Sequence, residues 1–556
     1  MKETLNNYPE LNERAVGWLN FLYEKATTSD DWTEDGEPNE WWDKTSTPPM
    51  CSFPRFDLQE STYSIGLMAD RTPAWREVYT EILDEIAERS ITYWAAVDWL
   101  SQFGNDPNRK NYPEEWKGTL IPEEFWGDYD APGWTANGIS PYGLQKDPIG
   151  ADGNLFFKGW LNLTQALHTY VSGVDKWASP FMAAGVDRTR FEWTQHQLVD
   201  HLFEQWTKTP MGPHCENTKA WPFCLSAAGL GLKMYDNVFN KESNAAYQMW
   251  LDHTKDKYYG FDKSGSLQRV TMYYDALKDH HHSTLPPHGL AIAFYAKPQA
   301  PEFAELLYRG AVNFMKWDDP SIPIMSLPDP RMMALGLSVS REFGDEVTYE
   351  RLKKHAEENF EPRFFGMNES QFGFWFNLGE AWPRGQLSAL AMCAEVCDKG
   401  AWEKLFNEPN LTKYDSPSIS GVDFPSVGVK QAWHDDDNGV LTFKILDGNK
   451  TKSNQPTKVC VSNIPNPEKV EVTCDGLIFK NFSVEDDGTL LINTDVDTHL
   501  FQVKTDYYLS EERKLKSQQG ISITATSASN HSGKKRSGAV SKLLISPAFS
   551  SSCGCC

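Results

Sequence analysis

The sequence has no uninterrupted apolar run of the roughly 18 to 20 residues that a membrane-spanning helix requires. Its first residues, MKETLNNYPELNERAVGW, are charged and polar where a secretion signal has an apolar stretch, so we expect a cytoplasmic protein. Basic side chains are outnumbered by acidic ones. The chain has 53 Lys and Arg and 77 Asp and Glu, which gives a formal net charge of −24. Phosphate backbones repel such a surface, and we therefore expect no nucleic-acid partner.

Cysteine is sparse, with ten among 556 residues. This density is far below that of a disulfide scaffold, so each cysteine is expected to be a thiol in a reducing interior. Three of them, Cys553, Cys555 and Cys556, crowd the last four positions behind the basic residues 534–536. This ending resembles the di-cysteine ends that are geranylgeranylated, and a cysteine cluster near basic residues is also a palmitoylation pattern. One reading is peripheral membrane attachment through these lipidated cysteines, and the other is an unmodified tail.

Hydrophobic residues make up 40% of the chain and aromatic residues 13%, enough for a large core. Thr72 and Pro73 look like a helix start, and apolar residues then recur at helical spacing from Trp75. Similar patterns predict helices over 191–206 and 386–397, separated by loops. Residues 1–415 therefore form one predicted all-α domain, a barrel or toroid of helix pairs. The Trp-, Gly-, Pro- and Asp-rich segment 105–153 reads as a long loop over one rim.

From about residue 416 the pattern changes to short β-prone runs. They cover 427–431, 440–445, 458–464, 469–474, 477–484, 489–493 and 499–503, with Asn-Gly and Asp-Gly turn signals between them. We predict a small antiparallel β domain over 416–505. Residues 506–556 are rich in Ser, Lys and Gly and are predicted to be disordered, and from Glu511 onward they hold seven basic and two acidic residues.

The densest chemical signal is His-Cys-Glu-Asn at 214–217, followed by Pro-Phe-Cys at 222–224. Cys215 and Cys224 are nine residues apart in a loop rich in proline and aromatic residues, and Glu216 adjoins the first thiol. An acid beside a tunable thiol suits proton transfer. The alternative is a pair of buried structural thiols, with Glu216 capping the next helix.

Other patterns favour structural roles. Consecutive histidines at 280–282 point in different directions and do not converge on one ion, so we expect a polar loop and no metal. Cys393 and Cys397 are four residues apart in a helical apolar pattern, which is core spacing. Glu380 and Arg384 are positioned to pair with each other and fix a loop.

Three stretches, 154–163, 214–224 and 379–386, together resemble the linalool dehydratase/isomerase family, where they occur in this order. The resemblance implies an (α/α)6 barrel with its active site in the barrel mouth, assembled as a homo-oligomer. It also implies cofactor-independent chemistry, in which a tertiary allylic terpene alcohol is dehydrated to a diene or isomerised to a primary alcohol.

The resemblance also implies site residues. The family's cysteine pair corresponds to Cys215 and Cys224, and its Asp and Tyr, six residues apart, correspond to Asp57 and Tyr63. In the family that Asp and Tyr reach into a neighbouring subunit's site, so the resemblance implies a site at a subunit interface. A further family tyrosine corresponds to Tyr274.

The sequence departs from the family at two places. Phe156 and Trp160 stand where the family has a Met and a His, and Gly66 stands where it has a third thiol. The histidine acid/base is then missing, whereas aromatic rings attract a positively charged transition state by roughly 0.5 to 2 kcal/mol each. We therefore expect Phe156, Trp160 and Phe223 to bind substrate, with Asp57 and Tyr63 supplying a proton.

These observations predict a cofactor-independent lyase or isomerase for a small hydrophobic alcohol or terpenoid, by dehydration, isomerisation or cyclisation. A first alternative is a carbohydrate-active barrel enzyme. It rests on tryptophans that suit sugar stacking, namely Trp32, Trp41, Trp42, Trp126 and Trp134. Such an enzyme also needs two opposed carboxylates. A second alternative is a non-catalytic scaffold that binds a hydrophobic ligand.

Overall fold

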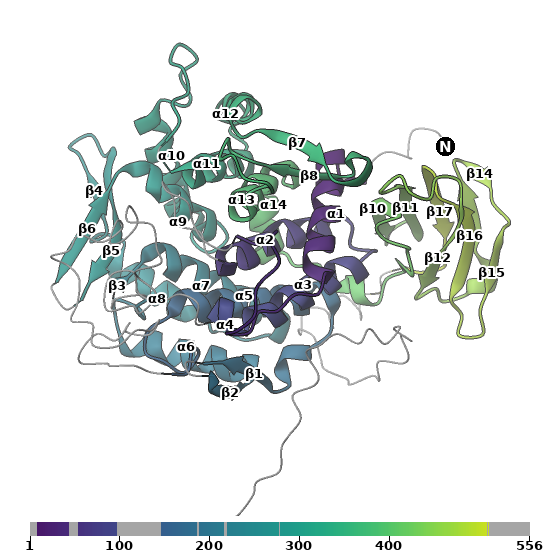
Figure 1. Cartoon of the computed structure of the whole chain (residues 1–556), viewed down its shortest axis with the longest axis horizontal. Helices are drawn as coiled ribbons and strands as arrows, with labels where there is room; N and C mark the ends of the chain where they lie inside the picture. Colours follow the sequence, from purple (N-terminus) through teal and green to yellow (C-terminus); the bar gives the residue numbers. More distant parts are fainter. Residues whose placement is uncertain are drawn as a thin grey trace, which may run out of the picture. The chain divides into compact units, whose positions relative to one another are not determined.

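The computed structural model describes residues 8–43, 54–96, 146–185, 188–215, 219–276, 279–327, 329–508 and 510. The chain divides into two units, Met1–Ser522 and Ile523–Cys556, and every described residue lies in the first. This part is mainly helical, with several antiparallel sheets (Figure 1). Within it, no helix combines the length and apolar character needed to cross a membrane. Nearly all of the predicted tail 506–556 and of the predicted loop 105–153 lie outside the described residues.

The helices of the described part run from α1 to α14 in chain order. They are α1 (Glu13–Thr27), α2 (Pro54–Arg71), α3 (Glu77–Ser90), α4 (Tyr93–Ala96), α5 (Leu155–Ser172), α6 (Gln195–Lys208), α7 (Pro222–Phe239), α8 (Ala245–Thr254), α9 (Gly289–Ala296), α10 (Pro301–Met315), α11 (Pro330–Phe343), α12 (Glu346–Asn359), α13 (Gly385–Val396) and α14 (Ala401–Asn407).

Six of these helices contact one another in a closed succession. Helix α2 packs on α5, α5 on α7, α7 on α9, α9 on α11 and α11 on α13, and α13 packs on α2 again. Helices α5, α7, α9 and α13 are buried on nearly every side, which is typical of interior helices. Helices α3, α10 and α12 pack on members of the succession, and α10 and α12 keep charged outer faces.

The packing of α5 against α7 depends on small residues. A Cβ atom added at Gly159 would lie 2.6 Å from the Cβ of Ala228, and one added at Gly231 would lie 3.1 Å from the carbonyl oxygen of Gly159. Glycine at both positions lets the two backbones approach closely. This approach brings the N-terminal turns of α5 and α7 together.

Short strands interrupt the helical part, contrary to the prediction that loops alone separate its helices. They are β1 (Phe181–Ala184), β2 (Arg190–Trp193), β3 (Lys219–Ala220), β4 (Tyr259–Phe261), β5 (Leu267–Asp275), β6 (His280–Thr284), β7 (Pro362–Phe365) and β8 (Gln371–Phe374). Strand β6 contains the histidines at 280–282, where a polar loop was expected. It pairs with β5, and ring stacking of Tyr273 on His282 at 4.7 Å helps to hold that pair.

Two helix boundaries also differ from prediction. Helix α3 begins at Glu77 and not after Thr72, because the Thr72 hydroxyl instead bonds the Met68 carbonyl at the end of α2. Residues 191–193 belong to β2, and α6 begins after Thr194, whose side chain forms a capping box with Gln197. The helix predicted over 386–397 is α13, within one residue at each end.

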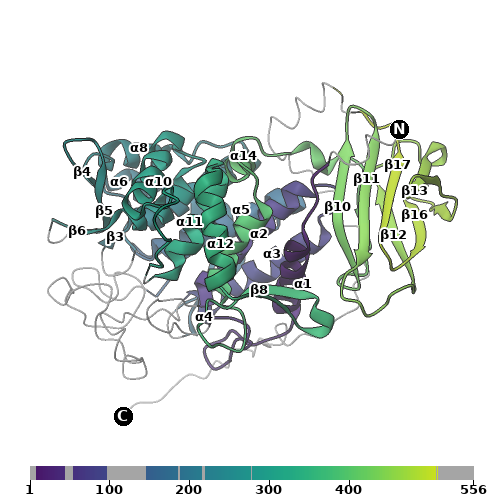
Figure 2. The ribbon, with the colours of Figure 1, turned by 90° about the horizontal axis from the view of Figure 1, so that it is seen from above.

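The C-terminal part of the described chain forms two antiparallel sheets, as predicted (Figure 2). One has the order β10-β11-β17-β13-β14 and the other β15-β16-β12-β9. Their strands are β9 (Ser418–Ser420), β10 (Val427–Asp435), β11 (Val440–Asp447), β12 (Pro456–Ser462), β13 (Glu471–Cys474), β14 (Leu477–Ile478), β15 (Phe482–Val484), β16 (Leu490–Asp495) and β17 (His499–Lys504). Both sheets contribute fully buried residues, among them Phe443, Phe501 and Ile492.

Backbone hydrogen bonds join this β region to the helical part. The Leu11 N–H donates to the Lys430 carbonyl at 2.8 Å, and the Ile419 N–H donates to the Ala74 carbonyl at 2.7 Å. The first residues before α1 therefore pair with β10, and β9 pairs with the turn between α2 and α3.

The substitution Gly159→Ala is expected to destabilise the fold by about 1 to 3 kcal/mol, because the added methyl group meets Ala228 and not open space. Urea unfolding measures this loss. Gly289→Ala is the matched control, since its Cβ would meet only ordinary contacts at 3.5 Å. Equal stability of the two variants would contradict the close α5–α7 contact.

Candidate active site

Helix α2 presents one face to the interior of the closed succession of helices. Phe56, Glu60 and Tyr63 lie four and three residues apart, and this spacing places them on the same side of the helix. Glu60 is 1% exposed and Tyr63 is 0% exposed. A carboxyl group and a phenol are therefore held together inside the protein.

Six aromatic side chains from four helices form a continuous group, here named the aromatic cluster. Its members are Phe56 and Tyr63 of α2, Phe156 and Trp160 of α5, Phe223 of α7 and Tyr295 of α9. The ring centroids are 4.1 Å apart for Phe156 and Trp160, 5.3 Å for Trp160 and Phe223, and 5.5 Å for Phe223 and Tyr295. All three predicted substrate-binding residues, Phe156, Trp160 and Phe223, lie in this cluster.

Hydrogen bonds link the polar atoms of the aromatic cluster. The indole N–H of Trp160 donates to the Tyr63 hydroxyl at 2.5 Å. The Tyr63 and Tyr295 hydroxyl oxygens are 3.0 Å apart, and either can donate. All three side chains belong to one chain and are fully buried, so their contact requires no neighbouring subunit.

Glu60 is a buried acid at one end of this network. Burial raises its pKa from the ordinary value of 4.5 to about 8, although hydrogen bonding from Gln386, the charge of Arg331 and hydrogen bonding from Tyr295 oppose the rise. Its Oε2 atom has no hydrogen-bond partner among the described residues. The neutral, protonated form is therefore favoured at pH 7, and this form can donate a proton.

Cys215 lies at the other end of the aromatic cluster. Its Sγ accepts the backbone N–H of Phe156 at 3.2 Å, in the first turn of α5. The positive end of the helix dipole therefore faces the sulfur. Cys215 is fully buried, so its sulfur is shielded from solvent.

A buried amine lies near this thiol. Burial lowers the pKa of Lys158 to about 7, with Asp152, Asp147 and Cys215 opposing the change. The ammonium group donates to the Ala151 carbonyl at 2.6 Å and to the Ile149 carbonyl at 3.3 Å. Lys158 thus adds positive charge on the α5 side of Cys215 whenever it is protonated.

Cys224 and Phe223 occupy the first turn of α7, which begins at Pro222. Cys224 was predicted in a loop, and its position in a helix is a correction; proline at the first helical position is the signal that explains it. Cys215 and Cys224 are both thiols. Glu216 lies outside the described residues.

Asp57 belongs to a separate ionic network. Its Oδ2 accepts Lys25 Nζ at 2.5 Å and the Asp43 N–H at 3.0 Å, and its Oδ1 accepts the Ser61 hydroxyl at 3.2 Å. Asp43 in turn accepts the N–H groups of Gly385 and Gln386 at the start of α13. Burial raises the pKa of Asp57 to about 6, although the Lys25 charge opposes the rise.

Tyr274 lies on β5, in a different group of contacts. Its hydroxyl donates to Asp279 at 2.9 Å, and its ring packs on Tyr258 and on His281. The structure thus brings Tyr63, Cys215 and the predicted aromatic residues together around one cluster, while Asp57 and Tyr274 make other contacts.

Two structural expectations agree with the observed geometry. Arg384 and Glu380 form an ion pair at 2.8 Å beside α13. Cys393 and Cys397 are buried at the end of the same helix, 1% and 4% exposed.

Three of the tryptophans proposed for sugar stacking lie in the described part of the chain, and each packs against another tryptophan ring. Trp32 and Trp42 are 3% and 2% exposed and pack on each other at 5.6 Å, and Trp41 packs on Trp382. Burial of Trp32 and Trp42 corrects the expectation of an exposed rim. Trp126 and Trp134 lie outside the described residues.

These features define a helical protein with a buried carboxyl group and a thiol beside a cluster of aromatic side chains. Residues 124–368 match the family model described as linalool dehydratase/isomerase. This match confirms the resemblance predicted from the sequence and supports a lyase or isomerase. The match includes Phe156, Trp160 and Cys215 but not α2, which carries Glu60 and Tyr63.

Solved structures show only weak likeness. An endoglucanase CelQ from Clostridium thermocellum, complexed with cellotriose, is 9% identical, with a TM-score of 0.32 and coverage of 90% of this chain and 94% of that one. A GH127 β-L-arabinofuranosidase from Geobacillus stearothermophilus T6 is 10% identical, with a TM-score of 0.20 and coverage of 89% and 75%. Scores this low support no glycosidase activity here. No curated protein matched the chain.

Sequence reasoning missed Glu60, Tyr295 and Lys158. Glu60 and Lys158 do carry a signal, because each is a charged residue at a position where the helical pattern requires a buried side chain. Tyr295 has no such signal, since it lies in an apolar run that reads as ordinary core.

We expect Glu60→Gln to raise the free energy of unfolding at pH 7 but not at pH 4. Between pH 4.5 and about 8 the unfolded chain ionises at this residue while the folded chain keeps the proton, so wild-type stability falls as pH rises. At pH 7 this ionisation lowers the free energy of unfolding of the wild type by at most about 3 kcal/mol. Urea unfolding of both proteins at the two pH values measures it, and an equal effect at both would contradict the buried neutral acid.

Proposed function

We propose that this chain is a cofactor-independent lyase or isomerase that acts on a small hydrophobic alkenol or terpenoid. The observation that carries the proposal is the neutral buried acid Glu60, which contacts one end of an aromatic cluster whose other end contacts the thiol of Cys215. The family match over residues 124–368 supports the same reaction class.

We further infer that the helical part is an (α/α)6 barrel. The closed succession α2, α5, α7, α9, α11 and α13 supports an inner ring of six helices, with the intervening helices outside. The aromatic cluster joins side chains of α2, α5, α7 and α9, four members of that succession, which supports a place for it within the ring.

In this proposal Glu60 replaces Asp57 as the proton donor. Loss of water from an alkenol begins with a proton transferred to its hydroxyl oxygen, and the protonated carboxyl of Glu60 supplies it, directly or through Tyr295 and Tyr63. Asp57 is less suited, because Lys25 and the Asp43 N–H already occupy its Oδ2 and the Ser61 hydroxyl occupies its Oδ1.

Departure of water leaves positive charge on an allylic carbon. The ring faces of Phe156, Trp160 and Phe223 stabilise such a charge by roughly 0.5 to 2 kcal/mol each once water is excluded. This role explains why tryptophan at position 160 is compatible with the reaction although the family has a histidine there. The site then relies on cation stabilisation more than on an imidazole base.

The reaction ends when a base removes a proton from a neighbouring carbon, which gives a diene. Cys215 is suited to this step, because the N-terminus of α5 and the Lys158 amine favour negative charge on its sulfur. The proton that Glu60 lost returns from the thiol through the released water, so each cycle is balanced. Readdition of water at the other allylic carbon would give isomerisation.

Three expectations stand beside this proposal. We retain catalytic roles for Cys224, Glu216 and Tyr274, a homo-oligomeric assembly, and membrane attachment through Cys553, Cys555 or Cys556. The family resemblance supports the roles of Cys224 and Tyr274 and the homo-oligomer, and the position of Glu216 beside the Cys215 thiol supports its role. The basic, cysteine-rich ending of the sequence supports membrane attachment.

Glu60→Gln is expected to lower turnover of a tertiary allylic terpene alcohol, such as linalool, by about 10² to 10⁴-fold, because the amide cannot donate the acid proton. In the wild type the rate should fall about tenfold per pH unit above pH 8, where Glu60 ionises. Gas chromatography of diene and alcohol products measures both effects.

Glu77→Gln is the control, since that carboxylate bonds the Gly421 and Val422 N–H groups in the β region. Normal turnover by folded Glu60→Gln, or a wild-type rate that stays constant to pH 10, would overturn the assignment of Glu60.

Cys215→Ala is expected to lower turnover by about 10²-fold or more, since it removes the proposed base while leaving the aromatic cluster in place. Cys460→Ala, a thiol of β12, is the matched control and should have wild-type activity. Full activity of a folded Cys215→Ala variant would rule out the thiol step.

A further inference from the structure

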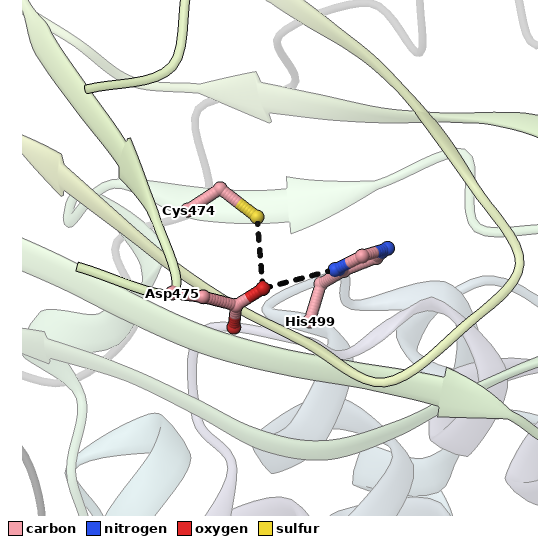
Figure 3. Close-up of side chains that lie close together, drawn as sticks. All are labelled: Cys474, Asp475 and His499. Atoms are coloured by element: carbon pink, nitrogen blue, oxygen red, sulfur yellow. Dashed lines mark hydrogen bonds and ion pairs between the residues drawn. The ribbon is translucent and has the colours of Figure 1, made fainter. Parts of the chain in front are cut away.

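Three side chains with metal-binding atoms meet at one corner of the C-terminal β region. Cys474 ends β13, Asp475 begins the turn to β14, and His499 begins β17 (Figure 3). The thiol and the imidazole both point toward the carboxylate of Asp475. Their three ligand atoms lie within 4.8 Å of one another.

Two of the three ligand separations suit a tetrahedral zinc ion, and the third, between the thiol and the imidazole, is at most 4.8 Å. Cys474 Sγ is 3.5 Å from Asp475 Oδ2, and this oxygen is 3.1 Å from His499 Nδ1. Zinc bond lengths of about 2.3 Å to sulfur and about 2.0 Å to nitrogen or oxygen place tetrahedral ligands about 3.5 Å (S to O) and about 3.3 Å (O to N) apart. Both observed separations are within about 0.2 Å of these values.

Hydrogen bonds from neighbouring groups orient two of the proposed ligands, Asp475 and His499. Asp475 Oδ1 accepts the Leu500 N–H at 2.9 Å, which leaves Oδ2 directed at the cysteine and the histidine. His499 Nε2 lies 3.1 Å from Asp495 Oδ1. A ligating histidine typically gives its other ring N–H to a carboxylate, and Asp495 occupies that position here.

The site also carries the charge that a cation requires. The carboxylates of Asp475 and Asp495 each lie 3.1 Å from a ring nitrogen of His499, and the Cys474 thiol lies 3.5 Å from Asp475. Acidic groups therefore outnumber the one imidazole at this corner, and a divalent cation would neutralise the excess negative charge.

We propose that Cys474, Asp475 and His499 bind one Zn²⁺ ion, with water in the fourth position. Binding displaces the thiol proton and any proton on His499 Nδ1, so it becomes stronger as pH rises. The ion would cross-link the β13–β14 turn to β17 and thereby fix the edge of the five-stranded sheet.

The test uses the full chain with Cys553, Cys555 and Cys556 changed to serine, so that no other cysteine cluster competes for the ion. Titration with Co²⁺ should give one thiolate-to-cobalt charge-transfer band at one equivalent, and Zn²⁺ should displace it. Cys474→Ser and His499→Ala should lose the band, and Asp495→Asn should weaken binding about 10 to 100-fold. Cys460→Ser, at the other cysteine of the β region, is the matched control.

A second measurement needs no substitution in the site. Zn²⁺ should protect Cys474, and not Cys460, from alkylation as read by mass spectrometry. Absence of the band and of this protection, or a band that survives Cys474→Ser, would overturn the proposal. Neither result depends on turnover, so the outcome is separate from that of the proposed lyase or isomerase activity.

Discussion

The buried charge of Asp57 is the constraint on which the arrangement of the helical part depends. A carboxylate that is 0% exposed must be paired, because an unpaired buried charge costs several kcal/mol. Lys25 of α1 and the N–H of Asp43 provide that pairing, and Asp43 binds the first N–H groups of α13. One connected network thus joins α1, α2 and α13 and closes the succession of helices at the point where its first and last members meet.

Closure at this point also explains why Glu60 differs from Asp57. Both carboxyls are buried on α2, but Asp57 has a cation as partner, whereas Glu60 faces the aromatic cluster and Gln386, a residue that the network brings in at the start of α13. Two acids three residues apart therefore have different roles. Asp57 is held as a structural anion, and Glu60 is kept neutral, a division that acid/base sites commonly use.

Much of the fold follows from local pattern. Alternation of apolar and polar residues with Asp-Gly turns locates β10 to β13, β16 and β17, and helical spacing locates α13, because these signals depend on neighbouring residues only. The single run predicted over 477–484 divides into β14 and β15, which belong to different sheets. The pattern does not reveal β5 and β6, since polar histidines stabilise that pair through contacts with Tyr273 and Tyr274 that exist only once the strands meet. Boundaries such as Glu77 depend likewise on whether a threonine caps one helix or ends another.

By itself the sequence determined the residue types of the site: aromatic side chains at 156, 160 and 223, a thiol at 215 and a tyrosine at 63. Only the tertiary structure decided which of these touch, and it added Glu60, Tyr295 and Lys158. The physical reason is that a pKa or a cation-stabilising ring acts through its surroundings, and those surroundings come from helices far apart in the chain. The corner formed by Cys474, Asp475 and His499 illustrates the same point, because 24 residues separate the last two and the pairing of β13 with β17 brings them together.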